Sequence, residues 1–200
     1  SSDLASSLIA LNGMPISSLE FQDNNEYLSI SFKAIEQGNI IVAVSTKTRS
    51  GDIDNEDTEG YLEEIGAPLS AREAFRELPG KPKLQRSYVK HMKSFSCIES
   101  CLLDNNINSI PIGQKLEFVT STNRNSFQLL LDGNPLPNHA VKIKDTTKKL
   151  FKIDTDANGQ FSIDESVSGT MMLSAVAVTL PEKATGLYHS DYATLVLTLN

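Results

Sequence analysis

The chain is poor in the side chains that many functional sites require. Among its 200 residues there is no Trp, and there are five Tyr, three His and two Cys. Carbohydrate-binding surfaces use exposed aromatic rings, and their supply here is thin. With three histidines and no H-E-x-x-H motif, the pattern of a zinc protease is missing. Neither a G-x-S-x-G motif nor a phosphate-binding glycine loop is present, so we expect a protein that is not an enzyme.

Long apolar runs and an excess of basic residues are missing as well. No stretch of about 18 apolar residues occurs, which predicts a protein without a transmembrane helix. The formal net charge of -7 argues against nucleic acid or an anionic membrane as a partner. The first residues, "SSDLASSLIA", show neither the basic segment nor the long apolar core of a signal peptide. A processed or shortened chain would begin in the same way, so this start does not decide the compartment.

The two cysteines, Cys97 and Cys101, lie in the sequence "SCIESC". Their C-x3-C spacing differs from the C-x2-C of zinc ribbons, and no second pair exists to complete four ligands. On a straight strand they would stand roughly 13 Å apart, too far for a disulfide. A helical turn, or a tight hairpin with Ile98-Glu99-Ser100 at its tip, would allow the bond. A disulfide and two ordinary thiols therefore both stay open.

What the chain does have is a globular composition with short apolar patterns. Hydrophobic residues make up 40% and charged residues 22%, enough for a packed core. Residues 4–11, 26–34 and 38–49 contain alternating or β-branched apolar side chains, which predicts strands. Residues 52–66 and 69–78 have apolar residues at helical spacing, which predicts one or two helices after the strands.

The second half of the chain has the pattern of a β-sandwich. The segment 85–100 fits both a helix and a long edge strand, and the polar segment 102–114 is typical of a domain boundary. About seven short β-type segments follow, separated by turn signals. The sequence therefore predicts a mainly β protein. A β-rich N-terminal portion over 1–111, with helices near 54–78, precedes an immunoglobulin-like or prealbumin-like sandwich over 112–200.

The stretch "KIDTDANGQFSIDE" fits the EF-hand calcium-loop pattern. Asp154, Asp156, Asn158 and Glu165 stand at ligand positions, and Gly159 stands at the turn position. An EF-hand needs a helix on each side, whereas both flanks here have the short apolar pattern of strands. Asn-Gly is also a strong hairpin signal, because both residues tolerate a positive φ. We interpret the stretch as a hairpin turn.

His189 and Asp191, in "YHSD", are the candidate metal ligands. On a strand, side chains two residues apart share a face, so an imidazole and a carboxylate could bind one ion. The alternative is a solvent-facing loop before the last strand, which we favour. His91, among lysines, and His139, after "PLPN", are expected at the surface.

Four stretches, taken in their order along the chain, resemble a known family. They are "GNIIVAVSTKTR", "GYLEEIGAP", "RSYVKHMKSF" and the tail from "LEFV" through "LLLDGNPLPNHAVKI" and "DTDANGQFSI" to "YATLVLTL". They resemble a bacterial periplasmic family of unknown biochemical function, labelled as a nickel- or cobalt-uptake component. The resemblance implies an exported protein with a C-terminal sandwich and makes residues 86–95 a strand.

The same resemblance implies two differences from that family. Family members usually begin with an upstream histidine-containing segment, so this sequence is expected to be truncated at its N-terminus. Where such sequences often have Ala-Val-His, this one has Ala175-Val176-Ala177, so a potential metal ligand is missing.

The leading hypothesis is an exported, periplasmic, non-enzymatic binding or accessory protein. The resemblance associates it with nickel or cobalt uptake, with such an ion as cofactor and a metal ion or membrane transporter as partner. The alternative is a periplasmic or cell-surface sandwich module that binds carbohydrate or protein through loops. An enzyme with residues scattered through the chain is a third class. Clustering of His91, His139 and His189 would favour metal binding, and dispersal would favour partner binding.

Overall fold

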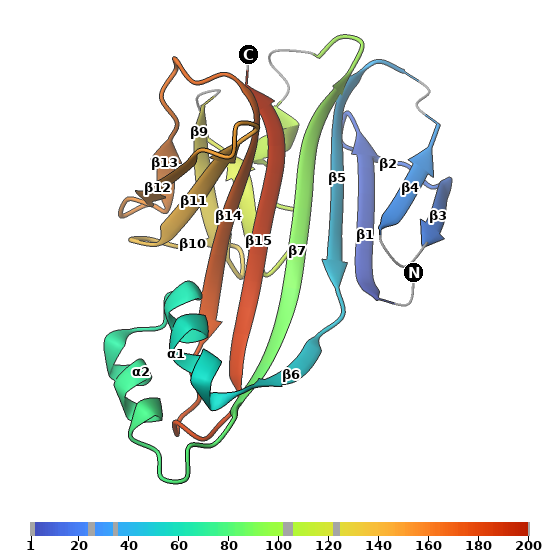
Figure 1. Ribbon diagram of the computed structural model, residues 1–200. Coiled ribbons are helices and arrows are strands. Elements are labelled where there is room, and N and C mark those ends of the chain that lie inside the picture. Colours follow the sequence, from blue (N-terminus) through green and yellow to red (C-terminus); the bar gives the residue numbers. More distant parts are fainter. Residues whose placement is uncertain (1–2, 24–26, 34–35, 102–105, 122–124, 200) are drawn as a thin grey trace.

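The part of the chain that the structure describes forms two facing β-sheets, a small third sheet and two α-helices (Figure 1). The computed structural model describes residues 3–23, 27–33, 36–101, 106–121 and 125–199. Strands account for 54% of the structure and helices for 11%. The prediction of a mainly β protein with a sandwich and one or two helices is confirmed.

The larger sheet has nine strands and runs through both halves of the chain. The long strand β7 lies at its centre, parallel to β15 on one side and antiparallel to β5 and β6 on the other. In spatial order the strands are β12 (Leu150–Asp154), β11 (Ala140–Asp145), β14 (Gly169–Thr179), β15 (Tyr188–Leu199), β7 (Leu84–Ile98), β5 (Gly38–Thr46), β1 (Leu4–Leu11) and β2 (Met14–Pro15), with β6 (Arg49–Ile53) also paired to β7.

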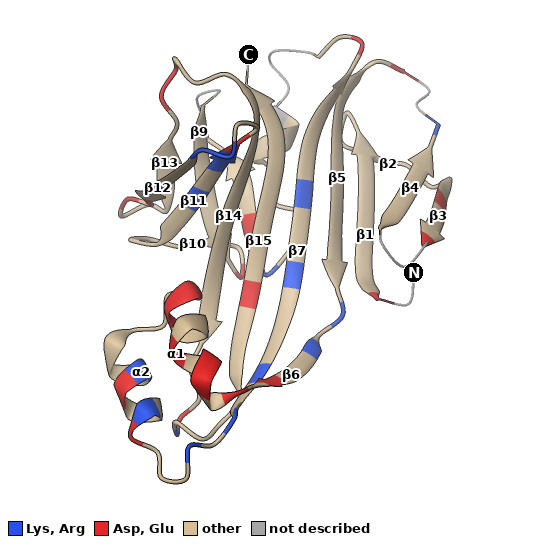
Figure 2. Cartoon of the chain, viewed as in Figure 1, with Lys and Arg blue, Asp and Glu red and all other residues tan. Residues whose placement is uncertain are grey.

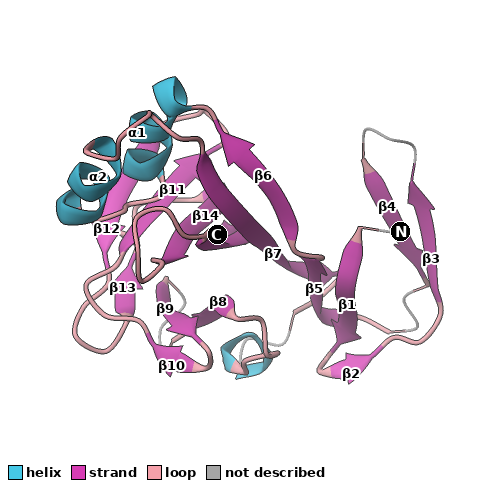
Figure 3. Cartoon of the chain, turned by 90° about the horizontal axis from the view of Figure 1, so that it is seen from below, coloured by secondary structure: helices cyan, strands magenta, loops and turns pink. Residues whose placement is uncertain are grey.

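A four-stranded sheet faces the larger one and closes the main core. Its strands are β8 (Leu116–Thr120), β9 (Ser126–Leu131), β10 (Asn134–Pro135) and β13 (Gln160–Ser162), and a short 3₁₀ helix (Asn106–Ser109) precedes β8. The core contains Phe118, Phe127 and Leu129 from this sheet, together with Leu173 and Leu195 from the larger one. Seen from below, β5 and β1 extend past the smaller sheet (Figure 3).

Two further clusters cover parts of the opposite face of the larger sheet. The helices α1 (Asn55–Glu64) and α2 (Leu69–Arg76) pack against β15 through Leu62, Phe75 and Tyr188. The hairpin of β3 (Leu19–Asp23) and β4 (Leu28–Phe32) packs near a cluster formed by Ile9 and Ile40. Alternation explains this division, because Ile40 and its neighbour Ile41 point to opposite faces of β5.

The structure refines the predicted elements. The segment 85–100, left open between a helix and an edge strand, belongs to β7 in the interior of the sheet. The predicted boundary segment 102–114 contains residues 102–105, which lie outside the described residues. The larger sheet contains strands from both sides of this segment. β14 and β15, which follow it in the chain, pair with each other, and β15 pairs with β7, which precedes it.

The turn at residues 155–159 is a strand–turn–strand, but it is not a hairpin. β12 pairs with β11 in the larger sheet, whereas β13 pairs with β9 in the smaller one. The Asp156 carboxylate accepts hydrogen bonds of 2.8 Å from the N–H groups of Asn158 and Gln160. Gly159 has φ +70°, and a Cβ there would lie 2.9 Å from the carbonyl oxygen of Leu129. The Asn-Gly signal therefore marks a turn between two sheets.

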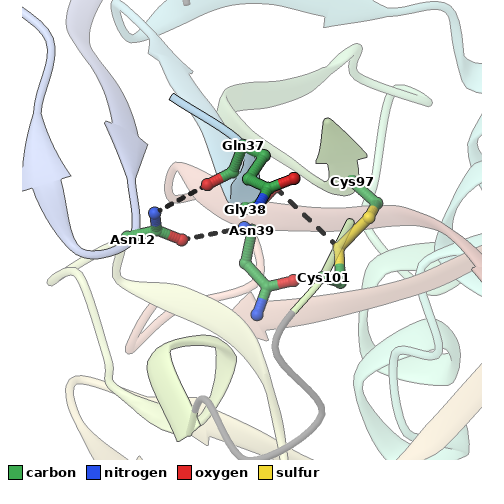
Figure 4. The surroundings of a disulfide bond; sticks show 6 residues. All are labelled: Asn12, Gln37, Gly38, Asn39, Cys97 and Cys101. Atoms are coloured by element: carbon green, nitrogen blue, oxygen red, sulfur yellow. Dashed lines mark hydrogen bonds between the residues drawn. A yellow bond between two sulfur atoms is a disulfide. The ribbon is translucent and has the colours of Figure 1, made fainter. Parts of the chain in front are cut away.

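Cys97 and Cys101 form a disulfide with Cα atoms 5.6 Å apart (Figure 4), at the C-terminal end of β7. Glu99 adopts φ +59°, which reverses the chain between the two cysteines. Beside the bridge, Asn12 accepts a hydrogen bond from the N–H of Asn39 and donates one to the carbonyl of Gln37. The turn after β1 is thereby tied to the start of β5.

We expect Leu195→Ala to lower the free energy of unfolding by about 2–5 kcal/mol, because it leaves a cavity in the main core. Leu195 is 0% exposed, whereas the next residue, Val196, points to the other face and is 36% exposed. Val196→Ala is the matched control, with an expected change of about 0.5–1 kcal/mol. Denaturant unfolding measures both values. Because the core joins both halves of the chain, one transition is expected, and two separated transitions would contradict a shared core.

Candidate functional site

Below the main core, the inner face of the larger sheet becomes polar. β15 carries one charged residue, Asp191, and its side chain is 2% exposed. Charged residues are dense on the helices and also occur on β7 and β11, whereas strands β5 and β14 carry none (Figure 2). An ionised carboxylate buried in a sheet needs partners to replace its hydration. The partners of Asp191 define the candidate site.

His91 on β7 contacts one oxygen of this carboxylate. Its Nε2 atom lies 3.4 Å from Oδ1 of Asp191, and its Nδ1 atom lies 2.9 Å from Oγ of Ser45. Ser45 and His91 are direct cross-strand neighbours of β5 and β7. With a proton on Nε2, the imidazole donates to Asp191 and accepts a hydrogen bond from the Ser45 hydroxyl. Both side chains are buried.

His189 approaches the other oxygen of the carboxylate. Its Nε2 atom lies 3.5 Å from Oδ2 of Asp191, and its Nδ1 atom lies 2.8 Å from Oγ of Ser87. His189 and Ser87 are neighbours in the parallel ladder of β15 and β7. The carboxylate therefore stands between two imidazoles, each supported by a serine hydroxyl.

Lys115 supplies the positive charge of the site. Its Nζ atom lies 2.8 Å from Oδ2 of Asp191, and its side chain is 40% exposed. Burial by itself raises the pKa of Asp191, but the hydrogen bonds from His91 and Lys115 and the charge of Lys115 outweigh it and lower that pKa to about 2. Asp191 is thus an anion at neutral pH, with a cation beside it.

Glu117 fixes the segment that carries Lys115. Its carboxylate accepts hydrogen bonds from the N–H groups of Ile112, Gly113 and Gln114, at 2.8, 3.1 and 3.1 Å. It also forms a buried ion pair with Lys93 of β7. Burial lowers the pKa of Lys93, and the negative charge of Glu117 acts in the opposite direction. Residues 112–115 are therefore held against the sheet by a buried charge.

A pocket of about 400 Å³ opens beside this network. We call it the β1–β5–β7 pocket. Its walls are hydroxyl and small side chains of β1 and β5, Val89 and His91 of β7, and the segment 112–115. Its volume lies within the range of small-molecule sites. The residues that line it are Ala5, Ser6, Ser7, Leu8, Ala43, Ser45, Thr46, Thr48, Val89, His91, Ile112, Gly113, Gln114 and Lys115.

Ser45, His91 and Asp191 have the residue types of a hydrolase triad, so acyl transfer must be weighed. Such chemistry needs free N–H donors that bind the developing oxyanion. The backbone N–H groups of residues 112–114, which line the same pocket as Ser45, already donate to Glu117. Ser45 is 7% exposed, and its hydroxyl oxygen also lies 3.3 Å from the amide nitrogen of the Gln114 side chain. Ser45 is therefore part of a network of hydrogen-bonded side chains, in which these backbone N–H donors are already engaged.

A metal ion bound at this site would have to use the Asp191 carboxylate as a ligand. Among the described residues, no group of three or more His, Cys, Asp or Glu side chains is placed to hold a metal ion. His189 and Asp191 share a face of β15, as expected if they lie on a strand. However, the Lys115 ammonium already contacts Oδ2 of Asp191. The acidic ligand positions of the calcium-loop pattern, such as Asp154 and Glu165, are exposed.

The predicted histidine positions need correction. His91 is 6% exposed and not at the surface, because β7 lies inside the sheet. His189 lies within β15, and the loop interpretation is wrong. His139 is half-buried elsewhere, with Nε2 2.9 Å from the carbonyl oxygen of Val176. Burial lowers the pKa of His139. Two of the three histidines therefore gather at Asp191, and the third does not.

Sequence reasoning missed several residues of the site. Lys115, Ser45, Ser87 and Glu117 come from three strands and a loop that have no common local pattern. The one available signal is the rarity of acidic residues in strands, since Asp191 is the one acidic residue of β15 and Glu117 the one acidic residue of β8. A charge in such a segment needs a buried partner.

Nothing matches this chain among protein-family models, curated proteins or solved structures. The resemblance to the nickel- or cobalt-uptake family therefore stays a prediction. In the described part of the chain, neither helix has the length and apolar character needed to cross a bilayer.

The lowered pKa of Asp191 predicts how its contribution to stability depends on pH. The pKa falls from 3.8 to about 2 on folding, so the contribution is complete above pH 4 and is lost as the pH drops through 2. The difference in free energy of unfolding between wild type and Asp191→Asn should shrink by about 2 kcal/mol between pH 5 and about pH 1.5. Urea titrations across this range measure it. The exposed Asp57→Asn serves as control, and an equal pH dependence in both variants would refute the assignment.

Proposed function

We propose that the protein is a non-enzymatic binding protein that holds a polar, negatively charged group in the β1–β5–β7 pocket. The observation that carries this proposal is the position of Lys115 in the pocket wall. An ammonium has three N–H donors, and Asp191 takes one of them. The others are available to a ligand, because the side chain is 40% exposed. Ser6, which pairs with Ser45 on the inner face, adds a further hydroxyl group to the lining.

The hydrogen bonds and ion pairs that fix residues 112–115 support binding rather than catalysis. The Asp191–Lys115 pair and the Glu117 carboxylate fix residues 112–115, so the pocket wall is formed before a ligand arrives. A preformed wall reduces the entropy cost of binding. The N–H groups that could stabilise an oxyanion are engaged with Glu117. An exported location and an accessory role beside a transporter remain expectations from the resemblance.

The proposal is tested by titrating isotope-labelled protein with succinate, citrate and N-acetylglutamate, and with succinamide as the uncharged counterpart. We expect the carboxylates to shift the amide resonances of residues 112–115 and of β1, and succinamide to shift them far less, because it lacks the charge that Lys115 binds. Lys115→Met should weaken carboxylate binding by about tenfold, which corresponds to the loss of roughly 1.4 kcal/mol.

The matched control is Lys90→Met, since Lys90 is exposed on the opposite face of β7. This variant should bind the carboxylates as the wild type does. If no anion shifts the pocket resonances, or if Lys115→Met binds as tightly as wild type, the proposed function is wrong.

A second candidate function is capture of nickel or cobalt, favoured by one observation. The Nε2 atoms of His91 and His189 face the two oxygens of Asp191, and each Nδ1 is held by a serine hydroxyl. Metal-binding imidazoles are commonly held by a hydrogen bond at their other nitrogen. Lys115 opposes this function, because its ammonium repels a cation and already engages the carboxylate.

We therefore expect Lys115→Ala to bind nickel more tightly than the wild type, by about tenfold or more, because a cation beside a ligand oxygen is removed. Calorimetric titration with nickel and with cobalt measures this change. His189→Ala in the same background should abolish the gain, whereas His139→Ala should leave it intact. Equal nickel affinities of wild type and Lys115→Ala would remove this site as a metal candidate.

A further inference from the structure

Arg86 differs from the other arginines that the structure describes. Arg49, Arg72 and Arg76 each form an ion pair with a carboxylate. Arg86, on β7, forms no ion pair with a described residue, and its Nε atom is buried without a hydrogen-bond partner. A charged group that leaves water needs acceptors in its place, so this guanidinium calls for an explanation.

Two tyrosine rings hold the guanidinium of Arg86 on the outer face of the larger sheet, opposite to the main core. Its central carbon lies 5.3 Å from the ring centre of Tyr61 in α1 and 4.9 Å from that of Tyr88 in β7. The ring faces attract the positive charge, but they offer no oxygen acceptor to the N–H groups. The ring contacts therefore explain where the guanidinium lies and leave its N–H donors unused.

The groups around this guanidinium keep the local charge positive. Lys90 lies on the same face, with Nζ 5.9 Å from the ring centre of Tyr88. The ring of Tyr192 packs edge-on against Tyr88, at 6.2 Å between centres. Burial raises the pKa of Tyr192, and the neighbouring Tyr61 and Glu64 raise it further, so this phenol stays neutral. Two cations thus stand against the single carboxylate of Glu64, in a chain with a formal net charge of -7.

Gly51 of β6 leaves room beside Arg86. The two residues are direct cross-strand neighbours, so a side chain at position 51 would lie on the same face as Arg86. A Cβ at this position would meet no atom within 4 Å. Gly51 is also not among the glycines with a positive φ, so its backbone would accept any L-residue. The absence of a side chain therefore leaves open space next to the guanidinium.

We propose that Arg86 is the centre of a second ligand site, on the outer face of the larger sheet, which binds a phosphate group as the free ion or as a monoester. The guanidinium fork matches two phosphate oxygens. Lys90 supplies a second charge, which suits a group that carries about -1.5 to -2 at neutral pH. A carboxylate has a single charge for the same two cations.

This site goes beyond the proposed function and does not depend on it. The β1–β5–β7 pocket is lined by Val89 and His91 of β7. Arg86, Tyr88 and Lys90 occupy the alternate positions of the same strand and point to the opposite face. A ligand at Arg86 and a ligand in the pocket are therefore separated by the sheet.

The test follows the ring resonances of protein labelled with ¹³C-tyrosine, because three of the five tyrosines stand at the site. We expect inorganic phosphate and methyl phosphate to shift the resonances of Tyr61, Tyr88 and Tyr192 in a saturable way. Acetate should bind about tenfold more weakly, and sodium chloride at equal ionic strength should leave them in place. Tyr27, beside β4, serves as the internal reference. Equal binding of both phosphates would identify a monoester ligand, and binding of inorganic phosphate alone would identify the free ion.

Variants separate binding from a merely structural role. Arg86→Lys keeps the charge but loses the fork, and should weaken phosphate binding by about tenfold. Gly51→Val fills the open space without removing a cation, and valine favours a strand, so binding should drop by about tenfold while the fold persists. Lys90→Met should weaken binding by about threefold. Lys144→Met is the control, since β14 and β15 separate β11 from β7, and it should bind like wild type.

Several results would overturn the inference. If phosphate shifts the tyrosine resonances no more than chloride does, Arg86 only ties α1 to the sheet. Wild-type affinity in both Arg86→Lys and Gly51→Val would lead to the same conclusion. If phosphate shifts residues 112–115 and not the tyrosines, the anion lies in the β1–β5–β7 pocket instead. Lys115→Met should leave the tyrosine response to phosphate unchanged, so this site and the proposed function can fail separately.

Discussion

The parallel pairing of β15 with β7 is the constraint on which the rest of the structure depends. It joins Tyr188–Val196 to Arg86–Ser94, with strands β8 to β14 between them in the sequence. The pairing places the sandwich strands and the N-terminal strands in one sheet, so that one core serves both. It also brings His189 to Ser87 and Asp191 to the strand of His91. Without this register, the candidate site would not assemble.

Two buried carboxylates organise the lower end of the sandwich. Asp191 needs positive and N–H partners because it lies where the apolar core ends, and Lys115 comes to it from the segment before β8. Glu117 holds that same segment through three N–H groups and pairs with Lys93. Removing one partner of a buried pair is costly, because a charge stays behind without compensation. Residues 112–115 of the pocket wall are therefore held by two buried carboxylates.

The sequence predicted the secondary structure of short segments better than it predicted which distant segments contact each other. Alternation identified residues 4–11 and 38–49 as strands, and helical spacing identified α1 and α2, because these signals lie within a few neighbouring residues. The interior position of β7 was missed, because the pattern of residues 85–100 fitted both a helix and an edge strand. One of its lysines, Lys93, is in fact buried against Glu117. Which strand pairs with which depends on the whole chain, and no local pattern states it.

The candidate site shows the same limit. The shared face of His189 and Asp191 followed from their spacing once a strand was assumed. The burial of His91 and the arrival of Lys115 could not be predicted, because both follow from the long-range register of β15 on β7. In the calcium-like loop, the Asn-Gly turn signal was read correctly as a turn. The strands on either side of this turn do not pair with each other, because β12 pairs with β11 in the larger sheet and β13 pairs with β9 in the smaller one.

The disulfide between Cys97 and Cys101 has a consequence for where the protein matures. Its cysteines are four positions apart, so the ring closes locally and needs no other strand to be in place. A ring this small constrains little of the unfolded chain, and such bridges add less stability than those that close long loops. The state of these two sulfurs would therefore report on the redox environment the chain has passed through, while the long-range sheet could form in either environment.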